Sequence, residues 1–175
     1  SGYLRMAQIG FNGRQPYLQA AGLRQKPADI PARTPAWQRW AIDTVKQIYQ
    51  EAPFKGRQVI TSLPSDDVFI DPVKVARASL DKLNELIPQK LQKRLPFCAD
   101  NALFQHIVAE SGDKAASEMV NVLAIATARE AIDRHLAIYE RAQLDVAGIS
   151  IWPMAMMTIC ARATSAQSEK LIRRT

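Results

Sequence analysis

The start of the chain alternates apolar and polar residues in the period-2 pattern of half-buried strands. Two such stretches, Tyr3–Ile9 and Tyr17–Leu23, flank the dipeptide Asn12-Gly13. That dipeptide supplies the positive φ angles that a tight turn requires, so the pattern predicts a β-hairpin. The next segment, Lys26–Pro35, holds three prolines and is typical of a connector.

A helix is predicted directly after this connector. Thr34 is a good N-cap residue, and Pro35 suits the first helical position. Apolar residues then recur every three or four positions until Glu51–Pro53, where the helix should end. Trp37 and Trp40 belong to this apolar stripe. Such a pair can form an aromatic platform for a peptide, but its spacing favours packing in the core.

From Gly56 onward the pattern predicts alternating strands and helices. The expected strands are Arg57–Ser62, Val68–Ile70 or Val68–Val75, Leu103–Ala109, Val120–Ala126 and Val146–Ile151. The expected helices are Leu80–Leu95, Arg129–Arg141 and Trp152–Ala163, the second with Ile132, Leu136 and Tyr139 on its apolar stripe. Arg57–Ser62 should be buried, and the nearly continuous apolar run Val120–Ala126 is typical of a central strand covered on both faces. Pro88 should kink or split the first of these helices.

This order of elements predicts an α/β fold in which helices cover a sheet. The hydrophobic fraction of 47% is enough to bury a core, which argues against disorder. Net charge is +6, but the basic residues are scattered, so a solvated surface is favoured over a nucleic-acid footprint. Attraction to anionic lipid or to an acidic partner stays open.

The two cysteines and the longest apolar run indicate the cellular compartment of the chain. Cys98 and Cys160 are far apart in apolar stretches, which favours two buried free thiols over a disulfide. The run Ile149–Ala161 is shorter than the roughly 18 residues of a membrane span, and Pro153 interrupts it. We therefore expect a soluble, cytoplasmic chain without a signal peptide.

Motifs for nucleotide or metal chemistry are absent from the sequence. The seven glycines are dispersed, so neither a Walker A nor a GxGxxG pattern exists, which argues against nucleotide binding by this chain alone. His106 and His135 lack zinc-ligand spacing to the cysteines and are expected to be structural or surface histidines.

Two other groups have a functional and a structural interpretation. Asp66, Asp67 and Asp71 could do general acid–base work, but they follow Leu63-Pro64-Ser65, where aspartate serves turns and caps. The methionines near the last predicted helix could line an adaptable groove, although core packing is favoured. They are Met154, Met156 and Met157.

Three stretches, in matching order and spacing, resemble the PilM family of type IV pilus assembly proteins and, more loosely, the cell-division protein FtsA. They are Gly56–Ser65, which ends in a Leu-Pro break, Leu91–Phe97, which ends in Pro-Phe, and Val122–Ala155, which contains strand, helix, turn, strand and helix start. Gln143 stands where the family usually has glycine, which predicts a less strained helix end here.

The resemblance implies an α/β (α+β) fold, namely part of the ribonuclease H-like first lobe of an actin-like ATPase with an inserted SHS2-type strand-helix-strand-strand subdomain. Residues 1–55 would be the partial lobe, 56–152 the inserted subdomain, and 153–175 a helix returning to the lobe followed by a frayed tail. The chain would begin after the family's Asp-Ile-Gly-Ser phosphate motif. No catalytic, cofactor-binding or metal-binding residue is therefore assigned, the chain alone is not expected to be an enzyme, and ATP and Mg²⁺ are possible cofactors of the full-length parent alone.

The resemblance also implies a role. PilM lies at the cytoplasmic face of the inner membrane and binds the short cytoplasmic N-terminal segment of a single-pass membrane protein, between the lobe and the inserted subdomain. We expect a scaffold with such a protein partner and no nucleic acid; the partner-binding residues are not assigned. Two alternatives stay open: an actin-like ATPase that is active only in the full-length chain, and a basic nucleic-acid-binding module.

Overall fold

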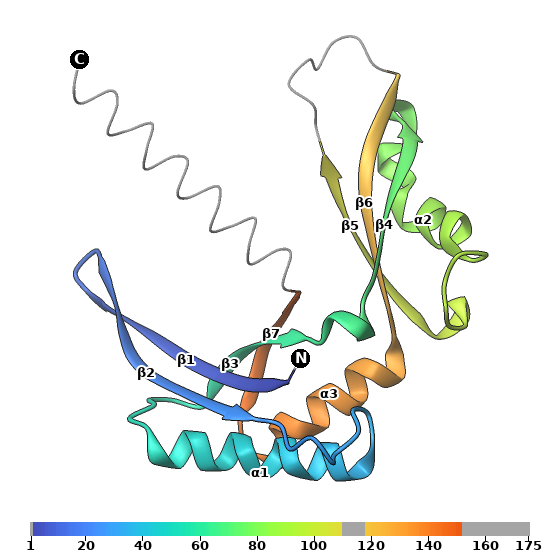
Figure 1. Ribbon diagram of the computed structural model, residues 1–175. Helices are drawn as coiled ribbons and strands as arrows, with labels where there is room; N and C mark the ends of the chain where they lie inside the picture. Colours follow the sequence, from blue (N-terminus) through green and yellow to red (C-terminus); the bar gives the residue numbers. More distant parts are fainter. Residues whose placement is uncertain (1, 110–117, 152–175) are drawn as a thin grey trace. The chain divides into compact units, whose positions relative to one another are not determined.

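The computed structural model describes residues 2–109 and 118–151, and these contain seven strands and three α-helices (Figure 1). The strands are β1 Tyr3–Asn12, β2 Gln15–Gln25, β3 Gln58–Leu63, β4 Phe69–Ala76, β5 Ala102–Ala109, β6 Met119–Ala128 and β7 Asp145–Ile151. The helices are α1 Pro35–Glu51, α2 Leu83–Leu91 and α3 Arg129–Arg141. The predicted α/β class is confirmed, but the strands form three small sheets, ordered β1-β2, β3-β7 and β4-β6-β5.

The described residues fall into two compact units. The first unit takes in residues 2–62 and 134–150, and the second takes in 63–109, 118–133 and 151. The division into a lobe, an inserted subdomain and a returning helix at residues 55 and 152 stays a prediction. The predicted helix Trp152–Ala163, with Met154, Met156, Met157 and Cys160, lies outside the described residues.

The first unit begins with the predicted hairpin. β1 and β2 pair antiparallel from Tyr3↔Gln25 to Asn12↔Gln15. Gly13 in the turn has a φ of 61°, but the positive φ expected at Asn12 is wrong, because Asn12 is the last residue of β1. A two-residue turn needs only one left-handed residue when its second position can stay right-handed.

Helix α1 begins as predicted and packs beneath the hairpin. Thr34 Oγ1 accepts a hydrogen bond from the Trp37 backbone N–H at 3.2 Å. The core of the first unit joins α1 to residues of α3 and the turn after it; its buried members are Ala41, Ile42, Val45, Ile138 and Leu144. Leu4 and Met6 of β1 pack against this cluster, as do Trp37 and Trp40, so the core interpretation of the two tryptophans is confirmed.

Two predictions in the first unit are wrong. Strand β3 is not buried along its length, because the Ile60 side chain is 79% exposed. The helix end after α3 is not relaxed either: Gln143 has a φ of 59°. Gln143 N–H donates to the Glu140 carbonyl and Leu144 N–H to the Tyr139 carbonyl, both at 2.9 Å, which is the hydrogen-bond pattern of a Schellman motif. Leu144 is buried and holds this left-handed cap in place.

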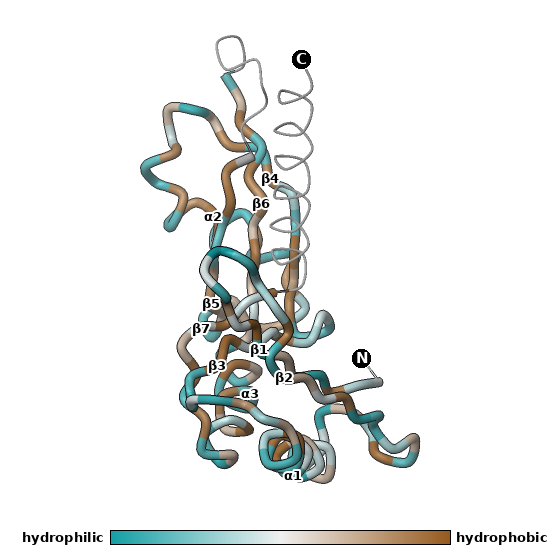
Figure 2. The backbone as a smooth tube through the Cα atoms, turned by 90° about the vertical axis from the view of Figure 1, so that its left-hand side faces the viewer, coloured by the Kyte–Doolittle hydropathy of each residue, from teal (hydrophilic) through white to brown (hydrophobic). Residues whose placement is uncertain are grey.

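The second unit is a three-stranded antiparallel sheet with α2 against one face. β6 is central, as predicted, but its burial alternates: Val120 to Ala126 are buried at every second position, whereas Leu123 and Ile125 are half-buried and Asn121 is exposed. The expected cover on both faces is therefore wrong. The buried side chains of β4 and β6 pack against Leu83, Ile87 and Leu91 of α2, and Figure 2 shows hydrophobic stretches along both strands.

The predicted helix Leu80–Leu95 is split, but not at the proline. A 3-10 segment, Arg77–Lys82, precedes α2, and Pro88 lies inside α2. Pro88 removes one backbone donor, yet the tight packing of α2 on the sheet tolerates this loss. Cys98 is a free thiol but is exposed, so its predicted burial is wrong, because it lies in the loop before β5 rather than in a core element. None of the helices in the described parts of the chain is long and apolar enough to cross a membrane.

Candidate protein-binding surface

The hairpin exposes an apolar sheet face. Cross-strand partners in an antiparallel pair point to the same side, so the register groups ten side chains on one face, which we call the outer face. Every one of the ten is exposed. They are the pairs Phe11–Pro16, Ile9–Leu18, Ala7–Ala21, Arg5–Leu23 and Tyr3–Gln25. Only Arg5 is charged, so a hydrophobic strip follows the hairpin.

A β-bulge builds part of the outer face. The register shifts between Gln8 and Ile9: Gln8 pairs with Ala20, whereas Ile9 pairs with Leu18, which leaves Gln19 as the extra residue. Without the bulge Leu18 would share the inner side with Ala20, because side chains alternate along a strand. With it, Leu18 lies beside Ile9, and these side chains are 62% and 54% exposed.

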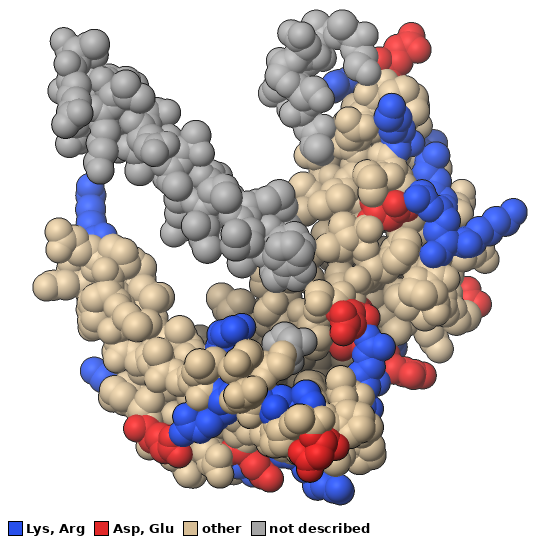
Figure 3. All heavy atoms as spheres, viewed as in Figure 1, with Lys and Arg blue, Asp and Glu red and all other residues tan. Residues whose placement is uncertain are grey.

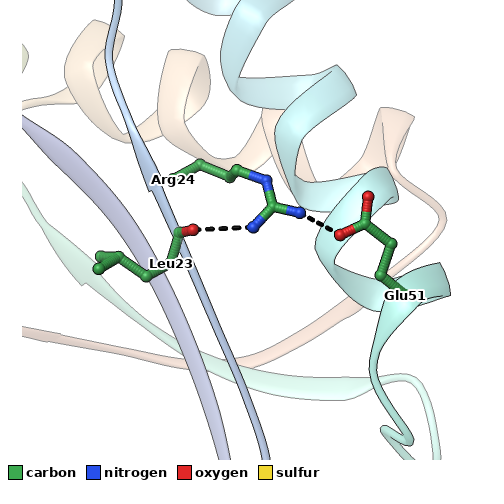
Figure 4. A network of polar contacts seen from close by, with 3 residues as sticks. All are labelled: Leu23, Arg24 and Glu51. Atoms are coloured by element: carbon green, nitrogen blue, oxygen red, sulfur yellow. Dashed lines mark hydrogen bonds and ion pairs between the residues drawn. The ribbon is translucent and has the colours of Figure 1, made fainter.

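The inner side of the hairpin is fixed to α1. Gly22 lies against Ile48, and a Cβ at position 22 would come within 2.2 Å of the Ile48 Cγ2 atom. Only glycine therefore permits this approach of strand to helix. Arg24 of β2 donates to the Leu23 carbonyl and forms an ion pair with Glu51 of α1 (Figure 4). The outer face is thus presented on a rigid support.

The hairpin is also uniformly basic. Residues 2–28 contain four basic residues and no Asp or Glu. The Arg5 guanidinium lies 5.2 Å from the centroid of the Tyr3 ring, a cation–π distance, and Arg14 is exposed in the turn. Neither Arg5 nor Arg14 forms an ion pair with a carboxylate in the part of the chain that is described. Figure 3 shows the hairpin as a largely tan surface with a basic side chain at its tip.

His135 is a structural histidine, as predicted. His135 is buried, and its Nε2 lies 2.7 Å from Thr61 Oγ1. Thr61 Oγ1 also donates to the Tyr139 hydroxyl at 2.6 Å, so His135 Nε2 is the donor to Thr61, because a hydroxyl has one hydrogen to give. Burial raises the pKa of Tyr139, and the Thr61 hydrogen bond offsets part of that rise. The cluster ties β3 to α3. His106 lies half-buried on β5.

The three aspartates do not form one site. Asp66 and Asp67 lie in a 3-10 turn, Ser65–Asp67, as the turn interpretation predicts. That interpretation is wrong for Asp71, which is buried on β4. Arg94 Nη2 donates to Asp71 Oδ1 at 2.7 Å, and Nη1 lies 2.6 Å from Oδ2. This ion pair, in which the hydrogen bond goes to Oδ1 while Oδ2 only lies close to the guanidinium, joins the turn after α2 to the sheet.

The described residues contain no glycine-rich loop that leads into a helix. Gly13 and Gly56, the glycines with positive φ in this part of the chain, lie in the hairpin turn and before β3, so neither leads into a helix. A phosphate loop needs backbone amides at a helix N-terminus. No group of three or more metal-ligating side chains occurs within residues 2–109 and 118–151.

Sequence reasoning did not find the outer face. Its alternating pattern predicts one buried and one exposed side, and large apolar residues occupy both. The signal was the absence of polar residues at the outward positions near the turn, namely Ile9 and Phe11. The register that adds Leu18 to them depends on the bulge and could not be read from the pattern.

Comparison with known proteins gives structural likeness only. No protein-family model and no curated protein matches the chain. A solved PilM-PilN type IV pilus biogenesis complex is similar over 88% of this chain and 46% of that chain, with a TM-score of 0.74 and 21% identity. The cytoplasmic domain of EpsL, an inner membrane component of the type II secretion system of Vibrio cholerae, covers 83% of this chain and 51% of its own, with a TM-score of 0.54 and 15% identity.

The chain therefore spans about half the length of each of these solved structures. The predicted resemblance to the PilM family is confirmed at the level of the fold. At these identities the likeness carries no partner and no activity over to this chain.

Proposed function

We propose that this chain is a protein-interaction module of a type IV pilus or related secretion assembly. The observation that carries the proposal is the exposed apolar outer face, held rigidly by α1, on a fold shared with the two assembly proteins above. Large exposed apolar strips on soluble domains mark interaction sites.

The proposed partner is the short cytoplasmic N-terminal segment of a single-pass inner-membrane protein. In this role the chain would be cytoplasmic and held at the membrane through its partner. Such a segment can dock by adding a strand to a sheet edge or by inserting apolar anchors. The two-stranded hairpin offers both: within the described residues β1 and β2 pair with each other alone, and the outer face supplies apolar contacts.

In this proposal the chain contributes binding and no turnover. Any binding or hydrolysis of ATP with Mg²⁺ would require a longer parent chain, because these 175 residues lack a phosphate motif. A longer chain that carries such a motif could couple nucleotide binding to the docking described here.

The test is isothermal titration calorimetry of the chain with a synthetic peptide that covers the whole cytoplasmic N-terminal segment of the candidate inner-membrane protein from the same genome. We expect saturable binding to the peptide and none to a scrambled peptide of the same composition. A sample that is folded by circular dichroism and binds no such segment would contradict the proposal.

A further inference from the structure

We infer that the outer face takes an amphipathic α-helix of a partner protein, with carboxylates along the margin of the helix's apolar stripe. The inference rests on the proposed function, because it names the partner chemistry of the same surface.

The sizes of the side chains along the outer face favour a helix as the partner. Ala7 and Ala21 form a rung of small side chains in the middle of the strip. On one side of it lie Ile9 and Leu18, and on the other lie Leu23 and the Arg5–Tyr3 pair. Because these two side chains are small, a helix laid across the strands can approach the sheet closely at this rung, with its apolar stripe between the larger side chains.

The charge of the hairpin favours an acidic margin on that helix. Arg5 lies on the outer face, and Arg14 lies exposed in the turn, without a carboxylate partner among the described residues. Arg24, by contrast, is already paired with Glu51 on the inner side. A partner that buries Leu18 and Ile9 would bring its own charges near Arg5 and Arg14. Carboxylates there gain attraction, whereas ammonium groups are repelled.

An anionic bilayer fits the same surface less well. Stable attachment of a protein to anionic lipid uses clusters of roughly four to eight basic residues. The outer face and turn offer Arg5 and Arg14.

The first experiment uses the whole chain and a labelled synthetic helix of about five turns (~18 residues) built from leucine and glutamate with leucines on one stripe. Fluorescence anisotropy measures its Kd beside that of a helix with lysine in place of glutamate. We expect the glutamate helix to bind at least about tenfold tighter, and the difference to shrink at high salt. Equal binding of both helices would overturn the acidic margin.

Variants locate the binding. Leu18→Asp should weaken binding of the glutamate helix about tenfold or more, because it places a carboxylate on the outer face. Ile60→Asp is the matched control: Ile60 is 79% exposed, belongs to the same unit and lies outside the hairpin, so its effect should stay under about twofold. Equal loss in both variants would overturn the assignment of the outer face.

Two further measurements test competing occupants. Sedimentation with vesicles of phosphatidylcholine and roughly 30% phosphatidylglycerol should leave the chain in solution; binding that Leu18→Asp abolishes would identify a bilayer and overturn the inference. Maleimide labelling of Leu18→Cys in a Cys160→Ser background has exposed Cys98 as an internal reference. We expect similar rates at both thiols, and labelling at least about tenfold slower at position 18 would show that the chain covers its own face and overturn the inference.

The outcomes separate this inference from the proposed function. If the inner-membrane segment binds but Leu18→Asp leaves that binding unchanged, the proposed function stands and the outer face is the wrong site. If the glutamate helix binds through the outer face but no inner-membrane segment binds, the surface chemistry stands and the proposed function fails.

Discussion

The two units differ in how far they bury their large apolar side chains. In the second unit eight buried residues form the core between the sheet and α2, and Met119 is the one large apolar side chain that its described residues expose. The first unit has a smaller buried cluster and exposes eight large apolar side chains, six of them on the hairpin. The second unit therefore buries nearly all of its large apolar side chains itself, whereas the first leaves an apolar face exposed, as the proposed docking requires.

The units also bury different polar groups. The first unit holds a hydrogen-bonded cluster of Thr61, His135 and Tyr139, and the second holds the Asp71–Arg94 ion pair. Each hydrogen bond of the cluster contributes about 0.5–1.5 kcal/mol net, a buried partner left unpaired costs more, and the cluster specifies how β3 meets α3. The side chain of Arg94 is 53% exposed, so solvent screens the ion pair and reduces its contribution.

The largest effect should come from the core of the second unit. Leu91→Ala removes a side chain that is wholly buried between α2 and the sheet, so we expect a loss of about 2–5 kcal/mol in the free energy of unfolding. Ile60→Ala is the control and should change it by less than about 0.5 kcal/mol. Urea unfolding followed by circular dichroism measures the free energy of unfolding of both variants. Similar losses would show that buried and exposed apolar residues contribute alike to stability.

The second-largest loss in the free energy of unfolding should come from the polar cluster of the first unit. Thr61→Val keeps the shape of the side chain but removes the hydroxyl that contacts His135 and Tyr139, so we expect a loss of about 1–3 kcal/mol. Thr61→Ser keeps the hydroxyl and should cost less. The same urea titration compares them, and a neutral Thr61→Val would show that the cluster contributes nothing to stability.

Tyr139→Phe should have a smaller effect that depends on pH. At neutral pH it removes one hydrogen bond, for about 0.5–1.5 kcal/mol. Because burial raises the pKa of Tyr139, the folded chain keeps this proton above about pH 10 while the unfolded chain loses it. The stabilisation that the protonated Tyr139 hydroxyl gives the folded chain is therefore complete below the ordinary tyrosine pKa, and it is lost as the pH rises above that value. The difference in the free energy of unfolding between the natural chain and Tyr139→Phe should become smaller between about pH 9 and about pH 11. A difference that grows over this range would contradict a raised pKa of Tyr139.

The smallest effect on stability should come from the outer face. Phe11→Ser and Leu18→Ser remove side chains that are 68% and 62% exposed, so each should change the free energy of unfolding by less than about 0.5 kcal/mol. Urea unfolding measures both, and a stability loss above 1 kcal/mol, roughly twice that limit, would mean that the strip is already covered.

Local signals in the sequence predicted the elements well and the burial of their faces poorly. Thr34-Pro35 and the glycine turn specified where α1 and the hairpin begin and turn, because caps and turns depend on adjacent residues. The predicted burial of Ile60 and Cys98 is wrong, because the apolar character of a side chain favours burial but does not show whether other residues lie over it. The turn prediction for Asp71 is wrong because its partner, Arg94, lies 23 residues further along the chain, where no local pattern indicates the pair.

The sequence by itself determined the α/β class, the hairpin, the three described helices and the family whose fold this chain shares, since these follow from periodicity, caps and the order of short motifs. The tertiary structure decided which apolar residues stay exposed, the bulge that turns Leu18 outward, and the pairing of Thr61 with His135 and Tyr139. These depend on register and on contacts between residues distant in the chain. A shift of one residue moves every side chain of a strand to its opposite face, and only the folded molecule fixes that shift.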